Sequence, residues 1–167
     1  MVVLKKILDF YINSSLHVAL SAFALVFMTQ YFFGVEGDFS VAFFAFFGTV
    51  VGYNFVKYDA ITRLNKTEIK KELKAIVFLS FISLLACFYF FLQLSWMSKL
   101  SAVAFLGLTL LYTLPFFPNK QNARNWKGVK IYIVGITWVG VTVILPLVEA
   151  EIPFSIDVFL MAFQRFL

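Results

Sequence analysis

Charged side chains are scarce in this sequence: they make up 14% of its 167 residues, whereas apolar side chains make up 62%. A soluble globular domain carries about 25% charged residues, and the mean hydropathy of +0.90 is equally far from that class. Several apolar runs approach twenty residues, the length that an α-helix needs to cross about 30 Å of hydrocarbon. These runs are continuous, without the alternation of barrel strands. The sequence therefore predicts an all-α polytopic membrane bundle, with residues 1–167 as one membrane domain and no soluble domain.

Cysteine and histidine are almost absent too. Cys87 is the only cysteine, which excludes an internal disulfide, and its place inside an apolar run predicts a small packed or lipid-facing residue. His17 is the only histidine, which excludes a His-rich metal site. No P-loop, GxSxG, HExxH or CxxC motif occurs, so none of these indicates an activity.

The apolar runs predict about five full transmembrane helices and a partial sixth. Residues 1–11 form an amphipathic segment that we expect at the membrane interface. The run that follows is too long for the apolar core of a signal peptide, so we expect it to be retained. The five predicted helices cover residues 13–33, 39–58, 65–94, 100–114 and 129–148. The sixth begins near Pro153 and reaches only about 22 Å by Leu167, so we expect the native chain to continue.

The charges predict the orientation of these helices. Twelve of the 14 Lys and Arg residues fall in the N-terminal segment, in the loop 57–74 and in the loop 120–130. These three segments lie on one side if the chain crosses the membrane at every helix, and the positive-inside rule makes that side cytoplasmic. The net charge of +5 is thus explained by topology, and we expect no nucleic-acid partner. A bacterial inner membrane is the expected location.

Polar residues gather where the second predicted helix ends, in the stretch GTVVGYNFVKYDAITR that runs from Gly48 to Arg63. Gly48 and Gly52 form a G-x-x-x-G pair, which predicts close packing against another helix. Four residues separate Asn54 from Tyr58, so both lie on one face of the helix. This end of the helix is the first candidate site, and its polar side chains are Asn54, Lys57, Tyr58, Asp59 and Arg63.

A second polar cluster surrounds the loop after the fourth predicted helix. It contains Tyr112, Lys120, Asn122, Arg124, Lys127 and Lys130. A solvated positive-inside loop explains these residues. The alternative is a basic rim that attracts a phosphate group or an anionic lipid head.

Two segments and one residue carry a resemblance to a known family. Asn54 matches the first position of an N-D-x-x-D-x-x-x-D motif at the end of the second helix. The segments LLYTLPFFPNK and KGVKIYIVGITWVGVTVILP are similar to the region after the fourth helix. In this pattern the chain resembles the UbiA superfamily of intramembrane prenyltransferases. The resemblance implies a UbiA-like helical bundle, of which this chain would be the N-terminal part.

The resemblance also implies a chemistry: transfer of an isoprenyl group from a diphosphate to a lipophilic acceptor, with Mg²⁺ held by carboxylates and bridging the diphosphate. Asn54 and Asp59 would then bind the metal. The implied contacts to the substrate and its diphosphate are Asn54, Lys57, Tyr58, Asp59, Arg63, Tyr112, Lys120 and Lys130.

The sequence departs from the family motif at its acids. Phe55, Tyr58 and Thr62 stand where the motif has aspartates, and Asp59 is one residue out of register. The second Asp-rich motif of the family would fall beyond Leu167. Whether the chain is an enzyme therefore stays open. A catalytically inactive UbiA-like scaffold, which binds lipid or serves as an accessory subunit and needs no cofactor, is the alternative; an unrelated small helical membrane protein is the third.

Overall fold

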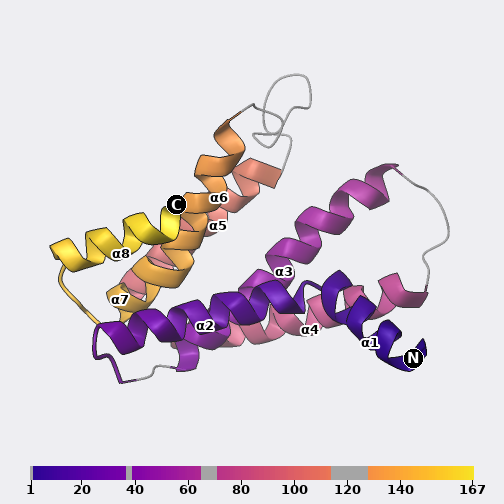
Figure 1. Ribbon diagram of the computed structural model, residues 1–167, viewed down its shortest axis with the longest axis horizontal. Helices are drawn as coiled ribbons and strands as arrows, with labels where there is room; N and C mark the ends of the chain where they lie inside the picture. The colour runs from indigo at the N-terminus through magenta and orange to yellow at the C-terminus, as the bar shows by residue number, and fades with distance from the viewer. Residues whose placement is uncertain (1, 37–38, 65–70, 114–127) are drawn as a thin grey trace.

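The computed structural model describes residues 2–36, 39–64, 71–113 and 128–167, and for residues 2, 59–64, 71, 72 and 112 it describes the backbone alone. Within these ranges every element is a helix, as the sequence predicts (Figure 1). In chain order the elements are α1 Val2–Asn13, α2 Leu16–Phe32, α3 Phe39–Leu64, α4 Lys71–Gln93, α5 Trp96–Thr113, α6 Val129–Val139, the π-helical segment η3 Gly140–Ile144, α7 Leu145–Glu149 and α8 Ile156–Phe166.

Three stretches of helix are long and apolar enough to cross a membrane: Phe39–Tyr58 in α3, Leu73–Gln93 in α4 and the run Val129–Glu149 through α6, η3 and α7. A fourth span is formed if α1 and α2, which meet at a bend of 60°, are taken as one. The apolar part of α5, Trp96–Leu111, is shorter. The predicted all-α membrane protein is thus confirmed at the level of three to four candidate spans among the described residues.

The bend between α1 and α2 separates an amphipathic helix from an apolar one. Asn13, Ser14 and Ser15 form it, and Ser15 has a φ of 61°. Asn and Ser side chains compete with the helix for backbone hydrogen bonds, which favours a break here. In α1 the side chains of Lys5 and Lys6 are exposed, and so is a set of large apolar ones: Val3, Leu4, Ile7 and Leu8.

Phenylalanine rings join α2, α3 and α4. The ring centroid of Phe43 on α3 lies 5.3 Å from that of Phe23 on α2 and 5.2 Å from that of Phe90 on α4. Phe47, one turn further along α3, stacks on Phe90 at 6.0 Å. Such ring pairs add to the energy of burial alone. They explain much of the high Phe content of the chain, because the rings fill the contacts between three helices.

A second group of contacts joins α2 and α5 to the helices that follow the basic loop. Gly140 in η3 lies directly against the ring of Phe105 on α5, and Gly135 in α6 lies against the ring of Phe166 on α8. Val143, Leu147 and Val158 form a buried cluster that attaches α8 to η3 and α7. The side chain of Arg165, in the last turn of α8, is half-buried.

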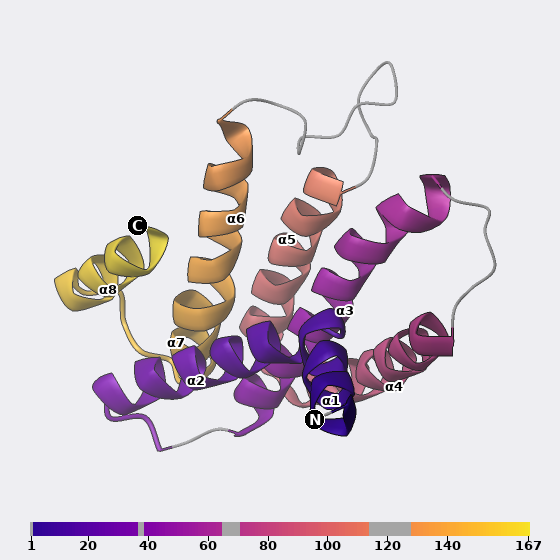
Figure 2. The ribbon, with the colours of Figure 1, turned by 45° about the vertical axis from the view of Figure 1, so that its right-hand side comes forward.

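Two hydrogen bonds bring the acidic turns of the chain to one end of the molecule. The backbone N–H of Ser95, in the α4–α5 turn, donates to the Glu149 carboxylate at 2.9 Å, at the end of α7. The Ser40 hydroxyl, at the start of α3, donates to Oε1 of Gln93 at the end of α4. Figures 1 and 2 show the α2–α3 and α7–α8 turns at this end, opposite the far end of α3 and the start of α6.

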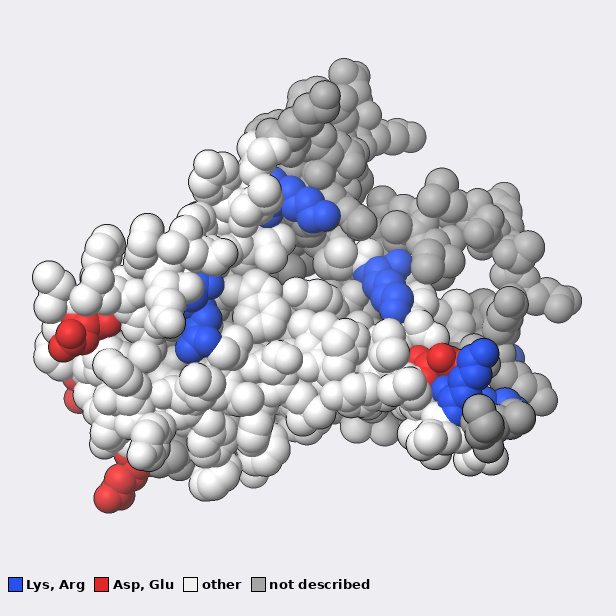
Figure 3. Space-filling model, viewed as in Figure 1, with Lys and Arg blue, Asp and Glu red and all other residues white. Residues whose placement is uncertain are grey.

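The charged side chains follow the same division. Glu36, Glu149, Glu151 and Asp157 occur in the turns at one end, together with Lys99. Lys57, Lys74 and Lys130 occur at the opposite ends of α3, α4 and α6. On the face drawn in Figure 3, acidic side chains appear at the left and lower left and in one place among the basic side chains at the right, whereas most Lys and Arg atoms lie toward the right and the top.

Candidate functional site

The C-terminal part of α3 carries the candidate site. The helix has 26 residues and continues past Tyr58, where its apolar span ends. Asn54, Lys57 and Tyr58 have described side chains. Asp59 and Arg63 lie on the helical backbone of the last two turns, but their side chains are outside the described part of the structure.

Asn54 links α3 to α4. Its side chain is only 3% exposed, and its Nδ2 donates to the Ser80 hydroxyl oxygen at 2.9 Å. The Ser80 hydroxyl in turn donates to the Ile76 carbonyl oxygen at 2.8 Å. Interhelical hydrogen bonds of this kind hold membrane helices together, because hydrocarbon offers no other partner. The Oδ1 of Asn54 is buried and receives no hydrogen bond from any described residue.

Lys57 and Tyr58 bind the end of α1. The Tyr58 hydroxyl donates to the Asn13 carbonyl oxygen at 2.9 Å, and the Lys57 ammonium lies 3.2 Å from the same oxygen. The ammonium also lies 3.4 Å from Oδ1 of Asn13 and 5.5 Å from the centre of the Tyr58 ring. The last carbonyls of a helix have no partner within it. We call these three residues the Asn13 clasp, because two side chains of α3 satisfy the carbonyl that the α1–α2 bend leaves open.

Asn54 and Tyr58, which were predicted to lie on one face of the helix, therefore contact two different neighbours. Asn54 contacts α4, whereas Tyr58 contacts the end of α1. Sequence reasoning missed both partners, Ser80 and Asn13. A polar side chain in or beside an apolar span is a signal that a partner exists, but the identity of the partner depends on how the helices are placed against one another.

The second predicted cluster lies on other helices. Lys130 is exposed in the first turn of α6, and Figure 2 shows α5 between α6 and α3. Tyr112 lies in the last turn of α5 and its side chain is not described. Lys120 falls outside the described ranges. No residue of this cluster whose side chain is described makes a hydrogen bond to a residue of the Asn13 clasp.

The small residues of α3 pack closely at one end of their stripe. Ala42 and Ala45 are fully buried, and a Cβ on Gly48 would meet the Cys87 sulfur at 3.6 Å, an ordinary contact. A Cβ on Gly52 would meet nothing within 4 Å. The close approach expected behind Gly52 is thus found earlier in the helix, and Asn54 is positioned by its bond to Ser80.

One further polar contact joins α3 to α6. The indole Nε1 of Trp138 donates to the Tyr53 hydroxyl at 3.2 Å, and the two rings meet edge to face with centroids 6.4 Å apart. Tyr53 and Trp138 are 85 residues apart in sequence. Neither residue had been singled out from the sequence, because one aromatic residue among many in an apolar span carries no distinguishing signal.

The described side chains at the end of α3 do not fit a magnesium site. Mg²⁺ requires several oxygen ligands, and the one open acceptor here is the buried Oδ1 of Asn54. No group of three or more His, Cys, Asp or Glu side chains comes together anywhere among the described residues. Asp59, the other predicted metal ligand, has no described side chain. We therefore derive no reaction step through a metal.

Comparisons with protein-family models, with curated proteins and with solved structures found no match to this chain. The likeness to the UbiA superfamily therefore depends on the sequence segments alone.

Proposed function

We propose that this chain is a UbiA-like membrane scaffold without catalytic activity, which serves as a lipid-binding or accessory subunit of a membrane complex. The observation that carries the proposal is the Asn13 clasp. The family resemblance assigns Lys57 and Tyr58 to a diphosphate, and in the structure both side chains bind the Asn13 carbonyl instead.

The carbonyl of Asn13 has two donors on α3, Lys57 and Tyr58. A lysine that binds a phosphate offers its ammonium group to the phosphate oxygens. Turning Lys57 and Tyr58 toward a diphosphate would leave that carbonyl without these two donors. Asn13 is exposed, so the loss of these donors costs the net contribution of the hydrogen bonds, about 0.5–1.5 kcal/mol each. The bend between α1 and α2 thus competes with a substrate for the same side chains, and a structural role for them follows.

The proposed topology is that of the sequence: about five full spans and a partial sixth, in a bacterial inner membrane. The N-terminus and the basic loops 57–74 and 120–130 face the cytoplasm. This proposal is supported by the opposite placement of Lys57, Lys74 and Lys130 and of the acidic turns. The positive-inside rule relates that difference to the two sides of a membrane.

Prenyl transfer is the second candidate, and one observation favours it. Asn54 matches the first position of the family motif, and its Oδ1 has no donor among the described residues. In this case Asn54 and Asp59 would take part in Mg²⁺ binding, and the diphosphate would contact Lys57, Arg63, Lys120 and Lys130.

One assay separates the two candidates. Membranes that contain the full chain are incubated with Mg²⁺, radiolabelled isoprenyl diphosphates and a lipid extract as the acceptor. The scaffold proposal expects no prenylated product above that of membranes without the chain. Product that disappears in Asn54→Ala and Asp59→Ala would establish the transferase and refute the scaffold.

The same preparations test the structural role of the clasp. Removing the Tyr58 hydroxyl in Tyr58→Phe deletes one hydrogen bond to Asn13, so the unfolding free energy in detergent should fall by about 1 kcal/mol. Tyr89→Phe is the matched control, because Tyr89 is an exposed tyrosine on α4. Equal stability of the two variants would contradict a stabilising role of the Tyr58 hydrogen bond and weaken the scaffold proposal.

A further inference from the structure

The helix α4 has two faces of different character. Its buried face contains Ile76 and Ser83, and it packs on α3. The opposite face is exposed along its length. Only 11% of the apolar window in α4 is buried, against 28% in α3 and 33% in the span that starts at Val129. Of the three long spans, α4 therefore offers the largest share of its surface to its surroundings.

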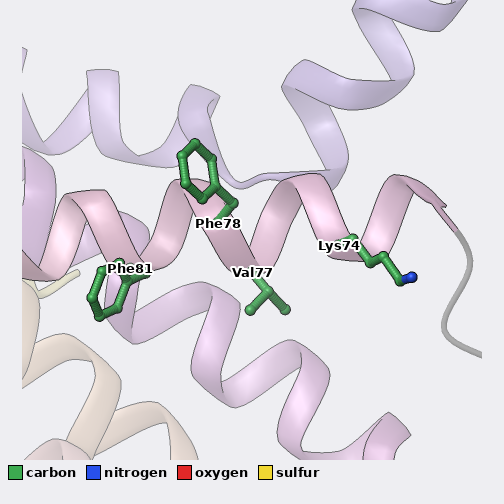
Figure 4. Close-up of a pocket in the computed structure, with 4 residues that line it drawn as sticks. All are labelled: Lys74, Val77, Phe78 and Phe81. Carbon is green, nitrogen blue, oxygen red and sulfur yellow. The ribbon is translucent and has the colours of Figure 1, made fainter.

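A groove lies on this exposed face, at the end of α4 that carries the basic residues. It has a volume of about 380 Å³ and is lined by Lys74, Val77, Phe78 and Phe81 (Figure 4). Lys74 precedes Val77 by three residues and Phe78 by four, and Phe81 follows them by four and three, so each is three or four residues from two others, the spacing of neighbours on a helix surface. The three apolar side chains are 57–66% exposed. Among the described residues that line it, the groove is thus an apolar wall with one cation, Lys74, at one end.

Lys74 lies where the apolar span begins. The span of α4 starts at Leu73, so the ammonium of Lys74 is at the level of the lipid head groups when the helix crosses a bilayer. A lysine at this position keeps its methylene chain along apolar surface and its charge in the polar layer. The apolar residues of the groove follow in the direction of the membrane interior.

We propose that this groove is a binding site for one anionic phospholipid. One acyl chain lies along Val77, Phe78 and Phe81, and the phosphate of the head group contacts the ammonium of Lys74. The apolar wall excludes a free phosphate or a polar metabolite as the occupant, because neither would gain from contact with it. The charge of Lys74 complements a negative head group and favours it over a zwitterionic one.

The residue types on α4 favour a lipid over another protein helix as the occupant. Membrane helices associate through small residues and interhelical hydrogen bonds. On α4 these are on the opposite face, where Ser80 bonds Asn54 and Cys87 lies against Gly48. The groove face instead continues with large exposed side chains, Leu85 and Phe88. This inference does not depend on the proposed scaffold function, since a transferase could carry the same lipid site.

A photocrosslinker placed in the groove tests the proposal. The full chain with Phe81→benzoylphenylalanine is reconstituted in vesicles of equal parts phosphatidylglycerol and phosphatidylcholine, irradiated and digested, and the adducts at position 81 are counted by mass spectrometry. The expected result is an excess of phosphatidylglycerol adducts over phosphatidylcholine adducts. In addition, Lys74→Gln should reduce that ratio about fivefold, the contribution of one basic residue near an anionic surface.

Two controls accompany the experiment. Lys74→Arg keeps the charge and should keep the ratio, whereas Lys99→Gln removes a lysine from the opposite end of the molecule and should leave the ratio unchanged. Adducts in proportion to the bulk lipids, or a ratio that Lys74→Gln does not alter, would overturn the proposal. Adducts mainly to a second copy of the chain or to another protein would overturn it as well, and would show a protein interface.

Discussion

Gly140 is the residue at which the packing of this bundle leaves least room. It is buried in η3, and a Cβ at this position would overlap the ring of Phe105 on α5. The ring and the η3 backbone can therefore be this close only because the side chain is absent. A similar contact exists at Gly135, where a Cβ would come within 2.8 Å of the Phe166 ring on α8.

The variant Gly140→Ala should therefore destabilise the protein. The added methyl group has to displace the Phe105 ring or separate α5 from η3, and overpacking of this kind costs about 1–3 kcal/mol. The measurement is the unfolding midpoint of the purified protein in detergent. Gly107→Ala on α5 is the matched control, because a Cβ there meets nothing within 4 Å. Alanine is also the better helix former by about 1 kcal/mol, so a loss in Gly107→Ala as large as that in Gly140→Ala would contradict the account.

For Asn54, the sequence predicted a special position but not its hydrogen-bond partner. Its polarity inside an apolar helix was a sound reason to predict a special position, and the structure gives it a buried bond to Ser80. The sequence could not name Ser80, since α4 has two serines, Ser80 and Ser83, and only the placement of α4 against α3 selects one. The functional role of Asn54 stays a prediction.

At the scale of elements, α2 supplies a hydrogen-bond donor to a carbonyl of η3 that lacks its usual partner within the helix. Pro146 has no N–H, so it cannot donate to the carbonyl of Thr142 four residues earlier. The Thr29 hydroxyl on α2 donates to this carbonyl at 2.7 Å, the shorter of its two contacts with carbonyl oxygens, the other being 3.0 Å to Leu25 of its own helix; both threonines are fully buried. The proline of one helix and the threonine of another therefore act as a pair.

This pairing predicts a compensating double variant. Thr29→Val removes the donor and should lower the unfolding free energy by about 1 kcal/mol. Pro146→Ala restores a backbone N–H, so Thr29→Val should cost clearly less when combined with it. Thr137→Val is the control, because the hydroxyl of Thr137 bonds a carbonyl of its own helix. Thermal unfolding of the four proteins gives the coupling, and strictly additive losses would show that Thr29 and Pro146 act independently.

Helix positions were well predicted wherever the apolar runs were long and bounded by charge. The span Phe39–Tyr58 coincides with the predicted second helix, and Leu73–Gln93 falls within the third. The break near Asn13 falls between the predicted interfacial segment and the first predicted helix, but two features had no sequence signal of comparable strength: the 60° angle of that bend and the π-helical segment at Gly140. Both depend on partners from distant helices, Tyr58 and Thr29, which local propensity does not contain.

At the scale of the whole molecule, the acidic turns lie at one end, and Lys57, Lys74 and Lys130 lie at the opposite ends of their helices. The Ser95–Glu149 and Ser40–Gln93 hydrogen bonds bring three turns to one end, and the Asn13 clasp lies at the end of α3 opposite its start. The sequence predicted this alternation from its charges. It did not predict that α5 would lie between the far end of α3 and the start of α6, as Figure 2 shows.

The proposed orientation of the bundle can be measured with single cysteines. Cys87 is the only native cysteine, so Cys87→Ala provides a background without reactive thiols. Glu36→Cys and Phe154→Cys report on the acidic end, and Lys5→Cys and Lys130→Cys report on the basic end, all at exposed positions.

In intact bacterial cells, a maleimide that cannot cross the inner membrane should label the first pair. The second pair should react only after the membrane is permeabilised, because the positive-inside rule keeps the basic end in the cytoplasm. Labelling of the basic pair in intact cells would reverse the orientation, and different results for Glu36→Cys and Phe154→Cys would contradict the placement of both turns on one side.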